Sequence, residues 1–231
     1  PITIQQARVP MGLMKKDHLR AIMSLEEVSQ RWMKVYGRQF TEDDVEAIYK
    51  EFEPLQIACI MDYAELIPGL LTTVEFLRRH DIKIGSTTGY TRNMMNALLP
   101  IAQKQGYHPD TCVCPDDVPA GRPYPWMCFQ NAILLQTYPL CAIVKVGDTI
   151  PDIEEGLNAG MWTIGIALTG NLLGMTEDEV KSLSPLELNE HKRRIYQQLY
   201  QAGAHFVVDS INDIPQVIEQ INELLRLGYQ P

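Results

Sequence analysis

The chain has 231 residues, of which 45% are apolar and 21% charged, a composition typical of globular proteins. Its 20 Lys and Arg against 29 Asp and Glu give a net charge of −9, which argues against nucleic acid as the main partner because phosphate backbones bind basic faces. No apolar run is long enough to span a membrane. Five cysteines without a CxxC pair predict reduced thiols and a cytoplasmic protein.

The first 62 residues are expected to be helical. Apolar residues recur at helical spacing from Val45 to Leu55, behind Thr41 as an N-cap and an acidic first turn. Pro54 is expected to bend or break this helix. Two further amphipathic helices are predicted over residues 14–23 and 24–36.

From about residue 66, strands alternate with helices. Strands are predicted at 82–86, 141–146, 162–167 and 205–208, with another that ends near residue 113. Helices are predicted at 70–80, 90–105, 126–135, 150–159, 177–201 with a break near 184–185, and 214–227. This alternation predicts a parallel sheet with right-handed crossovers. The expected organisation is therefore a helical module, residues 1–62, followed by an α/β domain, residues 63–231.

Polar residues gather where the predicted strands end, which is where open α/β sheets bind ligands. The run from Ser86 to Tyr90 offers hydroxyls and a glycine that either cradle an anion or simply cap the next helix. Asp148 and Asp152 suit a hard divalent cation such as Mg²⁺, or they only cap a helix. Arg122 is a candidate for binding a phosphate-like oxygen, unless it pairs with a nearby carboxylate.

The helical module contains one candidate for covalent chemistry. Lys15 and His18 are three residues apart and share a helix face. A lysine amine in a pocket can attack a carbonyl to form an imine, while a neighbouring histidine moves protons. The alternative is a solvated charge cluster, since Lys16 and Asp17 lie between them.

Together these segments resemble the phosphonoacetaldehyde hydrolases (phosphonatases), a family of the haloacid dehalogenase superfamily. The resemblance spans residues 2 to about 220, and it rests on four strings at residues 10–18, 82–92, 116–126 and 145–149. It implies an α/β fold with a Rossmann-like parallel-sheet core under a helical cap domain. It also implies Mg²⁺-assisted hydrolysis of the C–P bond of phosphonoacetaldehyde to acetaldehyde and phosphate, by a homodimeric enzyme whose partner is this small phosphonate.

The resemblance also implies roles for individual residues. Lys15 would form the imine, with His18 and Tyr90 assisting its proton transfers. The residues implied to contact substrate are Met11, Thr88, Gly89 and Arg122. Asp148 would bind Mg²⁺, and Asp152 would orient the water ligands of the metal.

The two adjacent lysines are expected to differ. An amine that attacks an aldehyde must be partly unprotonated, so the pKa of Lys15 should be lowered by burial and by the charge of Arg122. Lys16 points about 100° away around the helix and should stay solvated.

One motif of the superfamily has no match. An apolar strand that ends in Asp-x-x-Gly-Thr, whose Asp is the nucleophile, is absent from the sequence. We therefore expect an N-terminally incomplete form that holds the electrophilic half of the chemistry, with two core strands lacking a ladder partner. The alternatives are an inactive truncated partner or binding protein, and a plain phosphatase of the superfamily, which would need no imine lysine.

Overall fold

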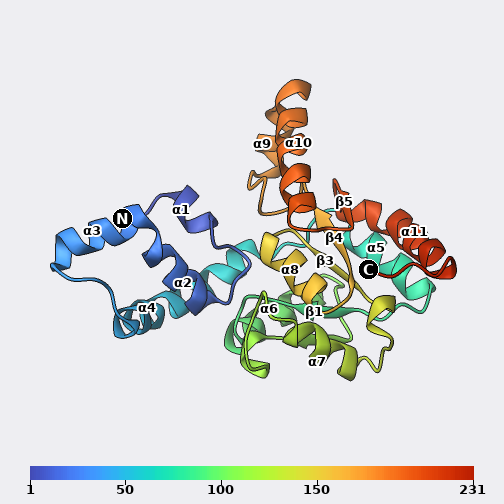
Figure 1. The fold of residues 1–231 in the computed structure, drawn as a ribbon, viewed down its shortest axis with the longest axis horizontal. Helices are drawn as coiled ribbons and strands as arrows, with labels where there is room; N and C mark the ends of the chain where they lie inside the picture. Colours follow the sequence, from blue (N-terminus) through green and yellow to red (C-terminus); the bar gives the residue numbers. More distant parts are fainter.

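The computed structural model describes residues 1–231, and its first four helices form a module that lies to one side of the strands (Figure 1). These helices are α1 (Ile4–Arg8), α2 (Lys15–Ser24), α3 (Glu26–Tyr36) and α4 (Glu42–Ile60). Helix α1 was not expected, because five residues carry too little periodicity to predict a helix. Of the expected bend or break at Pro54, the break is wrong: α4 continues to Ile60 because it packs against both α2 and α6, and tertiary packing outweighs the cost of one proline.

The remaining elements alternate as predicted, which confirms the α/β fold class. They are α5 (Leu70–Arg79), β1 (Gly85–Thr87), α6 (Arg92–Lys104), β2 (Thr111–Val113), α7 (Trp126–Leu134), β3 (Val144–Gly147), α8 (Ile150–Asn158), β4 (Trp162–Ile166), α9 (Glu177–Ser182), α10 (Pro185–Gln201), β5 (Phe206–Val208) and α11 (Ile214–Arg226). The expected break between α9 and α10 is present. Helix α6 begins later than predicted because Thr91 is its N-cap and accepts a hydrogen bond from the Met94 N–H.

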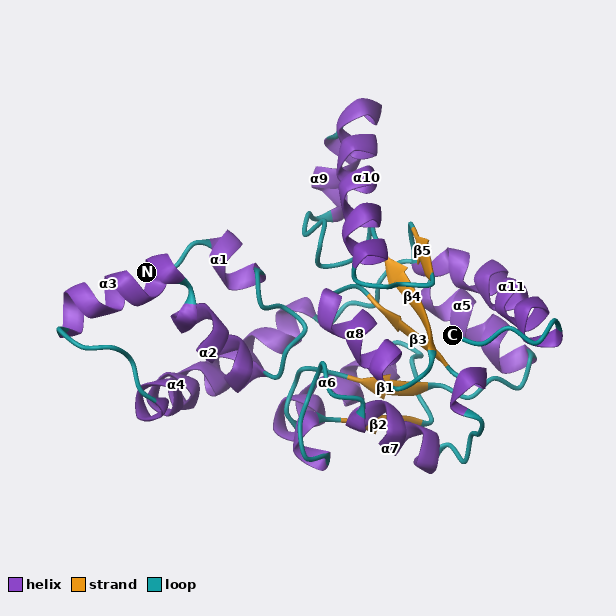
Figure 2. Ribbon diagram, in the orientation of Figure 1, coloured by secondary structure: helices purple, strands orange, loops and turns teal.

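All strand pairs are parallel, but they form two sheets instead of one (Figure 2). One sheet has the order β1-β2 and the other β3-β4-β5. Strands β1 and β3 share no backbone hydrogen bonds, since β1 pairs only with β2 and β3 only with β4. Side chains connect them, since Lys145 on β3 donates a 2.7 Å hydrogen bond to the Thr87 hydroxyl on β1.

The three-stranded sheet lies between two layers of helices. On one face, α8 and α10 contribute Ile153, Ile195 and Leu199, all fully buried. On the other face, α11 contributes Ile214, Val217 and Ile221, which pack against the side chains of β4. This packing fixes the N-terminus of α8 at the carboxyl end of β3, where the predicted acidic turn lies. None of the helices combines the length and the apolar character needed to cross a bilayer.

Candidate active site

The amine of Lys15 has no ion pair or hydrogen bond and lies over the ring of Tyr90, 4.9 Å from its centroid. Burial, and then the positive charge of Arg122, lower the pKa of Lys15 below its ordinary value. Both causes were expected from the sequence. Lys16, in contrast, forms an ion pair with Glu46. The two adjacent lysines therefore differ, although Lys16 is paired with Glu46 and not simply solvated as expected.

His18 is buried on the same face of α2 and has one free ring nitrogen. Its Nε2 lies 2.8 Å from the carbonyl of Ala7 in α1. A carbonyl only accepts, so Nε2 carries the proton and Nδ1, which has no partner, keeps its lone pair. Burial and the charge of Lys15 lower the pKa of His18, which keeps the ring neutral and able to accept a proton.

Tyr90 follows β1 and completes the surroundings of the Lys15 amine. Its hydroxyl accepts a 3.4 Å hydrogen bond from Gln56 of α4. Burial is the main cause that raises the pKa of Tyr90, so the hydroxyl stays protonated at neutral pH. The structure therefore brings together the three residues that the sequence analysis marked as catalytic.

Two glycines let the helical module approach the α/β core closely. Gly12 has φ +99°, and a Cβ there would lie 2.3 Å from the hydroxyl of Thr149. A Cβ on Gly89 would lie 2.5 Å from the carbonyl oxygen of Leu13. Met11 is half-buried in the same segment. Residues 11–13 of the module thus lie against the carboxyl ends of β1 and β3, and any side chain at either glycine would push them apart.

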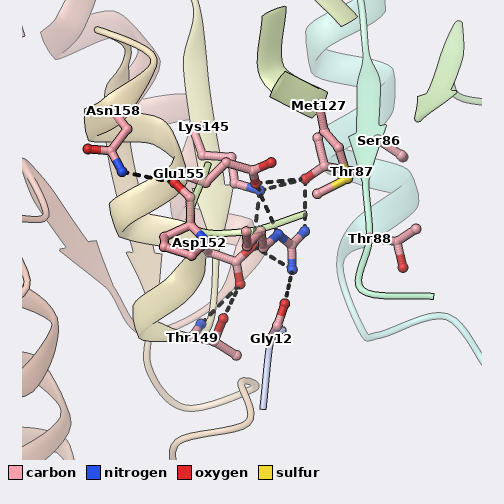
Figure 3. A network of polar contacts seen from close by, with 12 residues as sticks. Gly12, Ser86, Thr87, Thr88, Met127, Lys145, Thr149, Asp152, Glu155 and Asn158 are labelled. Carbon is pink, nitrogen blue, oxygen red and sulfur yellow. Dashed lines mark hydrogen bonds and ion pairs between the residues drawn. The ribbon is translucent and has the colours of Figure 1, made fainter. Parts of the chain in front are cut away.

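A buried network of charges occupies the space between β1 and β3 (Figure 3). The Arg122 guanidinium forms ion pairs of 3.0 Å with both Asp152 and Glu155. The Lys145 amine forms ion pairs of 3.0 Å and 2.8 Å with the same two carboxylates. The hydroxyl of Thr87 accepts hydrogen bonds from both cations and donates one to Glu155. Burial opposes charge on both cations, but Asp152 and Glu155 raise the pKa of each, so both stay protonated.

The network contains Arg122 and Asp152 from the predicted site but not Thr88. The Thr88 hydroxyl accepts a 3.0 Å hydrogen bond from the Tyr90 N–H, and Figure 3 shows its side chain directed away from the network. The sequence analysis missed Thr87, Lys145 and Glu155. A signal existed for two of them: Lys145 is a charge inside an apolar strand, and Glu155 is three residues after Asp152 on one face of α8.

The two aspartates of the acidic turn have different surroundings. Asp148 accepts a 2.7 Å hydrogen bond from the Asn171 N–H, and burial together with the nearby Asp152 raises its pKa. Asp152 has both oxygens in use, one by Arg122 and Lys145 and the other by the N–H and hydroxyl of Thr149. Although burial works in the opposite direction, these cations hold the pKa of Asp152 well below its ordinary value.

These surroundings show which of the two aspartate carboxylates could bind Mg²⁺. Asp148 fits a ligand position, because a cation would relieve the repulsion between its buried carboxylate and that of Asp152. Asp152 is not free to bind a metal directly. No group of three or more His, Cys, Asp or Glu is arranged to hold an ion. Of the two aspartates in the acidic turn, Asp148 is therefore the one available as a ligand.

Comparison with known proteins agrees with the fold. Residues 4–160 match the family model described as haloacid dehalogenase-like hydrolase. The phosphonoacetaldehyde hydrolase of Syntrophobacter fumaroxidans is 51% identical over 230 residues, which are 100% of this chain and 83% of that protein. The enzyme of that name from Bacillus cytotoxicus is 49% identical over 222 residues, which are 96% and 84% of the two chains.

Solved structures give the same result. A phosphonoacetaldehyde hydrolase-like protein from Oleispira antarctica superposes with a TM-score of 0.97 at 36% identity, over 100% of this chain and 83% of that one. A β-phosphoglucomutase from Clostridium difficile, 16% identical with a TM-score of 0.63 over 97% of this chain and 84% of that one, shares the fold alone. The chain is thus a hydrolase of the haloacid dehalogenase-like class. Within that class it belongs to the phosphonoacetaldehyde hydrolase family.

Proposed function

We propose that this protein hydrolyses the C–P bond of phosphonoacetaldehyde, giving acetaldehyde and phosphate, and that Lys15 forms the imine on which the reaction depends. The observation that carries the proposal is the Lys15 amine, which has no ion pair and a lowered pKa. It lies over the Tyr90 ring and close enough to His18 for its charge to lower the pKa of that ring. The names of the relatives support the same substrate.

The chemistry explains why such a lysine is needed. Breaking a C–P bond leaves an electron pair on carbon, and an alkyl carbanion is a very poor leaving group. An imine between Lys15 and the aldehyde accepts that pair as an enamine, while the phosphoryl group passes to a nucleophile. In the superfamily this nucleophile is the Asp of the Asp-x-x-Gly-Thr motif, which is not among residues 1–231. The free Nδ1 of His18 and the Tyr90 hydroxyl are the groups that move protons as the imine forms and the enamine is protonated.

The phosphoryl group would be bound at the carboxyl ends of β1 and β3. We propose that Arg122, Thr88 and the backbone at Gly89 bind its oxygens, with Met11 beside the aldehyde. A Mg²⁺ ion held by Asp148 would supply charge stabilisation to the phosphoryl oxygens, and Asp152 would act on this ion only indirectly, since its oxygens are taken. The homodimer and the cytoplasmic location expected from the sequence stay predictions.

A second candidate function is binding without turnover. It is favoured by one observation, the absence of an Asp-x-x-Gly-Thr string from the sequence. Such a chain would bind the aldehyde and the anion but would not transfer the phosphoryl group.

An assay of the chain with phosphonoacetaldehyde, with and without Mg²⁺, tests the proposal. Acetaldehyde is measured through NADH oxidation by alcohol dehydrogenase, and phosphate is measured in parallel. In a chain extended by an apolar strand that ends in Asp-x-x-Gly-Thr, the nucleophile motif that residues 1–231 lack, we expect equal amounts of both products. They should be lost in Lys15→Arg, which keeps the charge but forms no imine at that position, and kept in the matched control Lys16→Arg.

The other outcomes identify the alternatives. Imine trapped by borohydride without acetaldehyde release would support binding without turnover. Hydrolysis of a phosphate ester at a rate that Lys15→Arg leaves unchanged would support the plain phosphatase.

A further inference from the structure

Glu155 and Lys145 lie at the centre of the buried network and have no role in the chemistry described so far. One oxygen of Glu155, Oε2, is the common acceptor for Arg122 Nε at 3.0 Å, Lys145 Nζ at 2.8 Å and the Thr87 hydroxyl at 3.2 Å. The side chain of Glu155 is fully buried and that of Lys145 is 8% exposed. A single carboxylate oxygen therefore joins an arginine from a loop, a lysine from β3 and a threonine from β1.

The donors of Lys145 are all in use within this network. Its three N–H groups meet Thr87, Asp152 and Glu155. Lys145 therefore has no donor left for a ligand, and it acts on a bound anion only through the residues around it.

Arg122 keeps one donor free. Its Nε binds Glu155, Nη1 binds Asp152 and the Gly12 carbonyl, and Nη2 binds Thr87, which uses four of its five N–H groups. Because Glu155 and Asp152 bind neighbouring nitrogens of one rigid plane, they fix the orientation of the guanidinium. The direction of the free N–H is set by Glu155 and Asp152 together.

Stability does not explain this arrangement. Two cations and two carboxylates cancel in charge, but each has lost its hydration, and well-packed apolar residues are often as stabilising as a buried ion pair. The second oxygen of Glu155, Oε1, is buried without any partner, which is itself unfavourable. What Glu155 contributes to the network is a hydrogen-bond acceptor that fixes the position of Arg122.

We propose that Glu155 is a positioning residue for anion binding, which holds Arg122 and Lys145 in one arrangement through its Oε2. The inference rests on the proposed function in that Arg122 is the group that binds the phosphoryl oxygens. It adds Glu155, Lys145 and Thr87 to the machinery of the site.

The substitution Glu155→Gln distinguishes a positioning role from charge neutralisation and from simple support of the fold, because each role predicts a different change in anion affinity. The substitution makes the network one unit more positive. If Glu155 only neutralised charge, an anion would bind more tightly. If it only supported the fold, the melting temperature would fall and the affinity of the folded protein would be unchanged. A positioning role predicts weaker binding in spite of the added positive charge.

The experiment titrates the chain with inorganic phosphate in the presence of Mg²⁺, by calorimetry, alongside thermal unfolding. For Glu155→Gln we expect a Kd raised about tenfold or more, the change that follows the loss of one hydrogen bond to a charged group. The matched control is Glu154→Gln on the neighbouring residue, which makes no ion pair or side-chain hydrogen bond; it should bind phosphate as the parent does.

A second variant keeps the test decisive if Glu155→Gln does not fold. Lys145→Met with Glu155→Gln removes one cation and one carboxylate, so the network stays balanced between Arg122 and Asp152. We expect this pair of substitutions to recover melting temperature relative to the single variant while phosphate binding stays weak.

Tighter or unchanged phosphate binding in the folded variants would overturn the proposal, and so would a parent chain that binds no phosphate. The result is separate from that of the proposed function. If the chain extended by the nucleophile strand releases no acetaldehyde but binds phosphate in a Glu155-dependent way, C–P hydrolysis is refuted and this inference is supported.

Discussion

At the scale of single residues, the difference between Lys15 and Lys16 is set by what surrounds each amine. Lys15 lies over an aromatic ring without an acceptor, and Lys16 has a carboxylate partner. Burial and the charge of Arg122 both stabilise the neutral form of Lys15. The protonation and the partners of each lysine amine therefore depend on the face of α2 that the lysine occupies.

We predict that the charge of Arg122 controls the reactivity of Lys15. In Arg122→Gln the lost positive charge lets the pKa of Lys15 rise, so the fraction of neutral amine at a given pH falls. Reductive methylation followed by peptide mapping between about pH 6 and 9 should show the Lys15 profile shifted to higher pH. Lys16 in the same digest is the internal reference. An unshifted Lys15 profile would refute the coupling between the two residues.

The two aspartates of the acidic turn should respond to substitution with opposite signs. Asp148→Asn removes a buried charge that Asp152 repels, so we expect equal or higher stability at pH 7 and no further stabilisation by Mg²⁺. Asp152→Asn leaves Arg122 and Lys145 with one carboxylate fewer and should cost about 3 kcal/mol. Thermal unfolding with and without Mg²⁺ measures both. A stabilisation of Asp148→Asn by Mg²⁺ equal to that of the parent would show that Asp148 is not the ligand.

At the scale of elements, the segment between α1 and α2 joins the helical module to the core. Gly12 packs against Thr149 just before α8, and Arg8 of α1 donates to the carbonyls of Asn171 and Gly174. The N–H of Asn171 in turn binds Asp148. The position of the module is therefore coupled to the acidic turn through backbone contacts.

Gly12→Ala tests how close this approach must be. The substitution places a methyl group 2.3 Å from the Thr149 hydroxyl and also strains a positive φ. Gly37→Ala is the matched control, since Gly37 also has a positive φ, +70°, but has nothing within 4 Å of the added Cβ. We expect about 1 kcal/mol lost in the control, from backbone strain alone, and clearly more in Gly12→Ala. If denaturant titrations gave equal losses of unfolding free energy for the two variants, the close contact with Thr149 would not contribute to stability.

At the scale of the whole molecule, the buried histidines link stability to pH. Burial lowers the pKa of His18 and of His205, so the folded state binds fewer protons than the unfolded state just below the ordinary histidine pKa. Stability must then rise as pH rises through the window between the lowered pKa and about 6.5.

Replacing His18 by Gln should therefore flatten the pH dependence of the unfolding free energy between about pH 5 and 7. His108→Gln, at an exposed position without a side-chain hydrogen bond, is the control and should leave the slope unchanged. Urea titrations at several pH values give both slopes. A parent slope retained in His18→Gln would contradict the assignment of a buried neutral ring.

The sequence by itself determined the order of helices and strands, the parallel pairing and the joint position of Lys15 and His18. These features depend on periodicity, caps and spacing within one or two turns, which are local properties of the chain. Arg122 and Asp152 were candidates from their positions after the predicted strands, and the family resemblance added the role of Tyr90. The break expected at Pro54 failed because a local rule cannot include the packing of α4 against α2 and α6.

Only the tertiary structure decided how the chain's charges are arranged. Thr87 meets Lys145 across 58 positions of sequence, and Arg122 meets Gly12 across 110. No local pattern encodes such pairs, because the strands and α8 bring them together only when the core has packed. The buried position of Glu155 and the pairing of Arg122 with Asp152 follow from that packing, since a buried charge takes its partner from whatever the fold places beside it.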